Sequence, residues 1–158
     1  MDLTIFTDGG SLNNPGQAAI SFVVYLNGEV AHTFSKRIGI NSNNFAEYSA
    51  LVAALEWVKN NTVEKMSQNN VCARIPLRIS GFNQIGEPIL KITCYSDSNL
   101  MVNQVNGMFK VKNAAIREFI MKIRTLEQEI KIPILYKYIP REKNTLADSL
   151  VKKTLNRV

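Results

Sequence analysis

The chain has 158 residues, 46% of them hydrophobic, and its 19 Lys and Arg against 13 Asp and Glu give a formal net charge of +6. This size suits one globular core, so we expect residues 1–158 to form a single domain. The sequence holds no apolar run of the roughly 18 residues that a membrane span needs, and no segment typical of a signal peptide. Two cysteines and one histidine exclude a disulfide framework and a multi-histidine metal site. We therefore expect a cytoplasmic monomer that does not bind a membrane.

The positive charge is unevenly distributed along the chain. Residues from Lys110 onward include twelve Lys and Arg and five Asp and Glu, whereas the preceding residues carry a slight negative excess. Because clustered Lys and Arg side chains displace counterions from phosphates, this asymmetry favours a polyanionic partner. A basic face that is merely solvated would have the same composition, so both interpretations stay open at this point.

Hydrophobic periodicity predicts strands and helices in one mixed order. Asn27-Gly28, between two runs rich in β-forming residues, is a strong hairpin signal, and Asp8-Gly9-Gly10 indicates a tight turn after the first strand. We expect strands at 3–7, 19–26 and 29–37, a helix at 44–59, an inserted hairpin within 60–91 with strands at 75–82 and 88–95, helices at 98–105 and 116–130, a strand at 132–139 and a helix at 145–155. This order implies an α/β fold, a mixed sheet with helices packed on it.

Four acids stand where predicted elements begin or end: Asp8, Glu47, Asp97 and Asp148. Each has an ordinary structural explanation. Asp8 could form an Asx-turn, Asn44 and Glu47 fit a capping box with Asn44 as the cap, Asp97 could cap the next helix, and Asp148 could be solvated.

The joint placement of these acids favours a different interpretation. Asp8 and Asp97 end separate predicted strands, while Glu47 and Asp148 lie in the first turns of separate helices, so all four can converge if the strands are neighbours. Converging carboxylates repel one another unless a cation compensates them. Oxygen ligands without histidine or thiolate suit Mg²⁺ or Mn²⁺. Two such ions roughly 4 Å apart are the arrangement that supports phosphodiester hydrolysis.

The four acids lie within four polar motifs. These are residues 7–16 (TDGGSLNNPG), 42–48 (SNNFAEY), 96–107 (SDSNLMVNQVNG) and 140–148 (PREKNTLAD). Together and in this order they resemble the motifs of the type 1 ribonuclease H family, over nearly the whole chain. The resemblance implies a ribonuclease H-like mixed five-stranded sheet with helices on both faces, here with an inserted hairpin.

For function, the resemblance implies an endoribonuclease that hydrolyses the RNA strand of RNA/DNA hybrids with two Mg²⁺ ions, Mn²⁺ being an alternative, and leaves 5′-phosphate and 3′-hydroxyl ends. Asp8, Glu47, Asp97 and Asp148 match the family's catalytic, metal-binding acids. The positions that match its minor-groove contacts are Asn14, Asn43, Asn44 and Asn99, and Ser42 matches a residue that holds a DNA phosphate. Amide side chains suit this role because they can donate to and accept from an RNA 2′-hydroxyl.

Two departures from the family pattern are visible. The loop before Asp148 lacks the histidine of many members; Arg141 stands there instead, and His32 belongs to a predicted strand, so we expect no histidine step in the pH dependence of activity. The family's basic protrusion has no room within residues 108–113. Lys110 and Lys112 are the expected replacement for its grip on DNA phosphates. The 60–91 insertion could be an edge hairpin, a dimer contact or a substrate surface.

Two other functions are compatible with the same residues. A non-catalytic module could bind RNA/DNA hybrids with this fold, although the presence of all four acids favours an enzyme. A 3′–5′ exonuclease of related fold also uses four carboxylates, but it requires an acid two residues after the first Asp, where this chain has Gly10.

Overall fold

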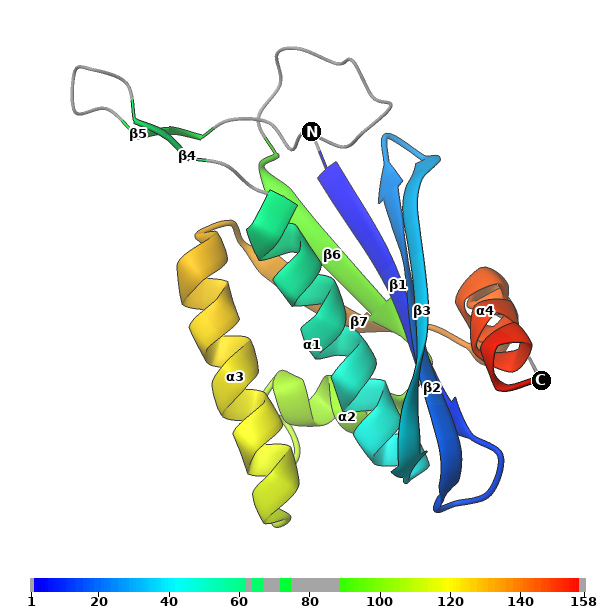
Figure 1. Cartoon of the computed structure of the whole chain (residues 1–158). Helices are drawn as coiled ribbons and strands as arrows, with labels where there is room; N and C mark the ends of the chain where they lie inside the picture. The colour runs from blue at the N-terminus through cyan, green and yellow to red at the C-terminus, as the bar shows by residue number, and fades with distance from the viewer. Residues whose placement is uncertain (1, 62–63, 67–71, 75–88, 157–158) are drawn as a thin grey trace.

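The computed structural model describes residues 2–61, 64–66, 72–74 and 89–156. Five strands form one mixed sheet in the order β3-β2-β1-β6-β7 (Figure 1). Strand β2 is antiparallel to both of its neighbours, β1 and β3, while β6 is parallel to both β1 and β7. The strands are β1 (Asp2–Ser11), β2 (Gly16–Leu26), β3 (Glu29–Asn41), β6 (Lys91–Ser96) and β7 (Ile134–Tyr138).

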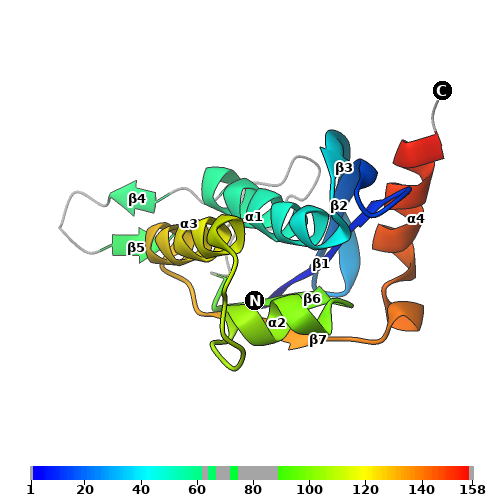
Figure 2. The same ribbon diagram turned by 90° about the horizontal axis from the view of Figure 1, so that it is seen from below.

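Helices cover both faces of this sheet (Figures 1 and 2). The helices are α1 (Asn43–Asn61), α2 (Asn99–Val105), α3 (Ala114–Ile130) and α4 (Thr145–Asn156), with a 3₁₀ turn, η1 (Arg141–Lys143), before α4. α1, α2 and α3 share one apolar core with the sheet, and α4 packs on the opposite face. The predicted five-stranded mixed sheet with helices on both faces is therefore confirmed.

The main core follows from the alternation of side chains along the strands. Ile5 on β1, Val24 on β2 and Ile92 on β6 are fully buried and belong to the core shared with α1 and α3. Within the part of the chain that the structure describes, no helix is long and apolar enough to cross a membrane.

Polar contacts fasten α4 to the second face of the sheet at both of its ends. Near its start, Ser21 Oγ on β2 donates to the Ala147 carbonyl oxygen at 2.7 Å. Near its end, Arg37 on β3 donates to the carbonyl oxygens of Thr154 at 2.8 Å and Leu155 at 3.2 Å. These carbonyls belong to the last turn of the helix, where they lack partners within the helix. The position of the α4 side chains is thus tied to β2 and β3.

The predicted tight turn at residues 8–10 is wrong. Strand β1 continues to Ser11, with Gly9 paired to Ile20 and Gly10 to Ala19. Gly9 is required by packing and not by a turn: a Cβ atom there would lie 2.3 Å from the Ala46 carbonyl carbon on α1. The glycine therefore lets the first turns of α1 approach the backbone of β1 directly.

The inserted hairpin also differs from the prediction. The antiparallel pair that the structure describes within 60–91 is β4 (Glu64–Met66) with β5 (Cys72–Arg74). Residues 75–82, the predicted first strand, lie outside the described residues. The predicted second strand is β6, which pairs with β1 and β7 in the main sheet, because its apolar residues belong to the central core.

Candidate active site

Three of the four acids form a compact cluster. Asp8 lies on β1, Asp97 directly follows β6, and the parallel register that pairs Thr7 with Ser96 puts these two acids side by side. Glu47 comes from the first turns of α1, which Gly9 allows close to β1. One ligand oxygen from each of these three side chains lies within 4.8 Å of the other two. The four sequence-predicted acids thus supply a three-carboxylate cluster, consisting of Asp8, Glu47 and Asp97.

The structure does not support the ordinary explanations of these acids. Asp8 lies within a strand and not in a turn. Ser42, and not Asn44, caps α1, since its Oγ accepts the Phe45 N–H at 3.1 Å. The cap of α2 is Ser98, whose Oγ accepts a backbone N–H from the first turn of that helix. The three carboxylates are therefore available for another purpose.

Burial and mutual repulsion make ionisation of the cluster unfavourable. Burial, followed by the charges of Asp97 and Asp148, raises the pKa of Asp8 to about 7. The pKa of Glu47 is raised well above its usual value, mainly by burial and then by the charges of Asp8 and Asp97. Burial also raises the pKa of Asp97. A cation at this position would favour the ionised form of all three.

The donor set fits a hard divalent cation. Glu47 Oε2 is buried and has no hydrogen-bond partner within the described residues, although a buried carboxylate oxygen is normally satisfied. The three side chains present only oxygen atoms, the ligand type that Mg²⁺ and Mn²⁺ prefer. Asp8, Glu47 and Asp97 could hold such an ion.

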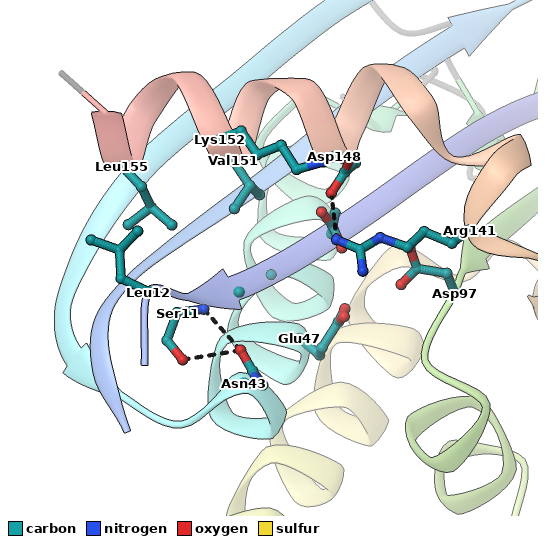
Figure 3. Close-up of a pocket in the computed structure, with 13 residues that line it drawn as sticks. Ser11, Leu12, Asn43, Glu47, Asp97, Arg141, Asp148, Val151, Lys152 and Leu155 are labelled. Atoms are coloured by element: carbon teal, nitrogen blue, oxygen red, sulfur yellow. Dashed lines mark hydrogen bonds and ion pairs between the residues drawn. The ribbon is translucent and has the colours of Figure 1, made fainter. Parts of the chain in front are cut away.

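Asp148 lines the same pocket but lies outside the cluster (Figure 3). Its Oδ1 is 3.2 Å from Nη2 of Arg141, and its Oδ2 is 2.7 Å from Nζ of Lys152, one turn further along α4. Burial opposes the ionisation of Asp148, but the hydrogen bonds from Lys152 and Arg141 outweigh it and lower the pKa. This carboxylate is therefore already neutralised by the chain's own cations.

The pocket has a volume of about 560 Å³ and is bordered by an amide network. Asn43 Oδ1 accepts the Ser11 backbone N–H at 2.9 Å and the Ser11 Oγ–H at 3.0 Å. The backbone N–H of Asn43 in turn donates to Asn14 Oδ1 at 3.0 Å. The structure thus brings two of the predicted substrate residues, Asn14 and Asn43, together next to the carboxylates, and Asn43 itself lines the pocket.

The other predicted substrate residues do not line this pocket. Asn44 follows Asn43 in the first turn of α1, and Asn99, the first residue of α2, is exposed and accepts a bond from Asn103 Nδ2 to its Oδ1 at 3.0 Å. Lys110 and Lys112 are exposed in the loop that joins α2 to α3. Figure 1 shows this loop at the end of the molecule where α1 begins.

His32 takes no part in the site. Its ring stacks on Trp57 of α1, with ring centroids 4.8 Å apart, and it does not line the pocket.

Sequence reasoning missed two residues at the site, Lys152 and Asn144. Lys152 lies four residues after Asp148 in a helix, and this spacing is a signal that could have identified the ion pair. Asn144 donates from Nδ2 to the Thr7 carbonyl oxygen at 2.9 Å and approaches Asp97 Oδ2 at 3.5 Å. It precedes a helix, where an asparagine looks like an ordinary cap.

A partly buried three-carboxylate cluster beside two parallel strands, with a fourth acid from a helix lining the same pocket, defines a nuclease-type carboxylate site on an α/β fold. The family model described as RNase H matches residues 1–156, and the chain belongs to that family.

Solved relatives extend over nearly the whole chain. RNase H1 of Halobacterium salinarum superposes with a TM-score of 0.77 at 26% identity, covering 99% of this chain and 98% of that one. LC11-RNase H1, solved in complex with an RNA/DNA hybrid, has a TM-score of 0.76 at 31% identity, covering 98% and 96%. The Bifunctional protein Rv2228c of Mycobacterium tuberculosis is 27% identical over 99% of this chain, which spans 36% of that protein's length.

Proposed function

We propose that residues 1–158 form a single catalytic domain that acts as a ribonuclease H, an endonuclease that cleaves the RNA strand of RNA/DNA hybrids and leaves 5′-phosphate and 3′-hydroxyl ends. The observation that carries this proposal is the cluster of Asp8, Glu47 and Asp97, in which the buried Glu47 Oε2 has no hydrogen-bond partner among the described residues. Membership of the RNase H family and the hybrid bound by LC11-RNase H1 support an RNA/DNA hybrid as the substrate.

The cofactor we propose is Mg²⁺, with Mn²⁺ as an alternative, held by Asp8, Glu47 and Asp97 and joined by Asp148. A pair of such ions, when bound, would activate water for attack on the scissile phosphate and stabilise the departing 3′-oxygen. The chain's own contribution is to bring the carboxylates together. Asp8 lies next to both other acids of the cluster. It is beside Asp97 because Thr7 pairs with Ser96, and its carboxylate is also close to that of Glu47. Asp148 forms ion pairs with Arg141 and Lys152, which would have to be exchanged for a metal ion.

The amide network offers a way to recognise RNA. Amide groups can both donate to and accept from a 2′-hydroxyl, the group that distinguishes RNA from DNA. Asn14 and Asn43 are fixed to each other and to Ser11, so less conformational freedom is lost when they bind substrate. Together with Asn44 and Asn99 they would face the minor groove of the hybrid, and Ser42 would lie near a DNA phosphate.

Cleavage of an internally labelled RNA/DNA hybrid tests the function. We expect internal cuts in the RNA strand alone with Mg²⁺, none with chelator, and no cutting of the DNA strand. Asp8→Asn should abolish cleavage while the fold is preserved, as checked by circular dichroism. Stepwise shortening from 3′ ends would favour the exonuclease, and a mobility shift without cleavage would favour the binding module.

Lys110 and Lys112 are proposed to hold phosphates of the DNA strand. Both are exposed and lie beside exposed Met108 and Phe109 in the α2–α3 loop. Each substitution by Ala should lower the slope of log affinity against log salt by about 1, since one counterion fewer is released. Lys91→Ala is the matched control, because Lys91 lies at the start of β6, the strand end opposite to Asp97. An unchanged slope in both loop variants would contradict this assignment.

A further inference from the structure

Asn144 connects the two segments that carry the cations and the fourth acid of the site. It lies between η1 and α4 and is only 1% exposed. Its backbone N–H donates to the Arg141 carbonyl oxygen at 3.0 Å, and its carbonyl oxygen accepts the Asp148 N–H at 3.1 Å. The backbone of Asn144 therefore joins η1, which carries Arg141, to α4, which carries Asp148.

The side chain of Asn144 does not act as a helix cap. An asparagine directly before a helix normally uses its side-chain oxygen to accept an N–H of the first turn. Asn144 Oδ1 is buried and has no hydrogen-bond partner within the described residues. An unsatisfied buried polar atom is costly and calls for an explanation.

The explanation lies at the other end of the amide. Nδ2 donates to the Thr7 carbonyl oxygen at 2.9 Å, and this bond fixes the orientation of the group. The same nitrogen lies 3.5 Å from Asp97 Oδ2. Because Thr7 immediately precedes Asp8 and pairs with Ser96, one buried amide contacts both the backbone beside Asp8 and the carboxylate of Asp97.

We propose that Asn144 is a positioning residue, whose amide holds Asp97 in register with Asp8 so that the three-carboxylate cluster is ready for a divalent cation. Hydrogen-bond partners of metal ligands orient those ligands and affect metal affinity. A serine would cap α4 without leaving a buried oxygen unsatisfied, so the amide donor is the property that this position provides. This inference rests on the proposed function, because it assumes that the cluster binds a cation.

Calorimetric titration of the metal-free chain with Mn²⁺, without substrate, tests the inference. Asn144→Ser keeps a residue favoured before helices, but its short hydroxyl cannot reach both Thr7 and Asp97. We expect its Mn²⁺ affinity to fall at least about 10-fold. The matched control is Ser21→Ala, which removes another buried bond between the sheet and α4 without contacting a carboxylate, and its Mn²⁺ affinity should not change. Equal losses in both variants would mean that Asn144 only fastens α4.

A double-mutant cycle separates action through Asp97 from general loosening. If Asn144 acts through Asp97, Asn144→Ser should cost little further Mn²⁺ affinity in an Asp97→Asn background. The same fold loss in both backgrounds would overturn the inference. If Asn144→Ser does not fold, Asn144→Thr carries the same expectation. Wild-type chain that binds no Mn²⁺ would refute the proposed function as well, whereas wild-type binding that Asn144→Ser leaves intact would refute this inference alone.

Discussion

Gly9→Ala should displace α1 from the sheet and impair the site. The added Cβ atom would lie 2.3, 2.4 and 2.5 Å from three backbone atoms of Ala46 and Glu47, whereas ordinary contacts begin at 3.4 Å. Backbone atoms cannot rotate away, so the first turns of α1 must move by about 1 Å, and Glu47 with them. Overpacking of this kind costs about 3 kcal/mol, and a misplacement of about 1 Å at a catalytic group can cost about 100-fold in rate.

Gly10→Ala provides a matched control, because its added Cβ atom would meet only Val151 Cγ1, at 3.6 Å. Both variants should be compared with the wild type by urea unfolding, by Mn²⁺ titration and by hybrid cleavage. We expect Gly9→Ala to lose stability, Mn²⁺ affinity and activity, and Gly10→Ala to retain all three. If Gly9→Ala has the same unfolding midpoint and the same Mn²⁺ affinity as the wild type, the position of α1 does not depend on glycine at residue 9.

The remaining predictions concern charge at the site. The pKa of Asp8 is about 7 in the folded chain against an ordinary value near 3.9, so the folded state binds the proton more tightly. The free energy of unfolding of the metal-free protein should therefore fall, by up to about 4 kcal/mol, as the pH rises from 4 to 7. Addition of Mn²⁺ at pH 8 should restore it. A free energy of unfolding that does not change with pH in the presence of chelator would contradict this. Lys152→Ala removes one of the two cations that neutralise Asp148 and should raise Mn²⁺ affinity a few-fold at low salt. Lys153→Ala, the same change at the neighbouring residue, is the control. Calorimetry that gives Lys152→Ala an equal or lower Mn²⁺ affinity than the wild type would contradict the idea that Lys152 competes with the metal ion for Asp148.

The fold was largely predictable because its elements are marked by strong local patterns. The Asn27-Gly28 hairpin, the change of period after residue 43 and the apolar stripe of α3 each define an element without reference to the rest of the chain. The turn at Gly9 was wrong because the requirement for glycine there comes from a helix that begins 34 residues later. The hairpin predicted within residues 60–91 paired a strand at 75–82 with the strand before Asp97, whereas that second strand, β6, pairs with β1 and β7. The pattern of one strand does not reveal which other strand it pairs with.

The site was predictable as a set of acids but not in its internal arrangement. The four carboxylates are recognisable from their motifs, yet the separation of Asp148 from the three-carboxylate cluster depends on two ion pairs formed in the folded state. A capping box with Asn44 as the cap was an alternative explanation of Glu47, because Glu47 follows Asn44 at capping-box spacing, whereas Ser42 caps α1 in the structure. Asn144 could not be recognised because its partners, Thr7 and Asp97, come from distant segments.

Strand β3 is an edge strand of the sheet and is 13 residues long. A long edge strand presents backbone N–H and C=O groups to which a strand of another chain can pair, and such pairing leads to aggregation. Two irregularities in its pairing with β2, between Ala18 and Ala19 and between Val24 and Tyr25, increase its twist, and the exposed Lys36 places a charge along it. The irregular pairing and the charge on β3 are therefore features that disfavour pairing of this strand with the sheet of another copy.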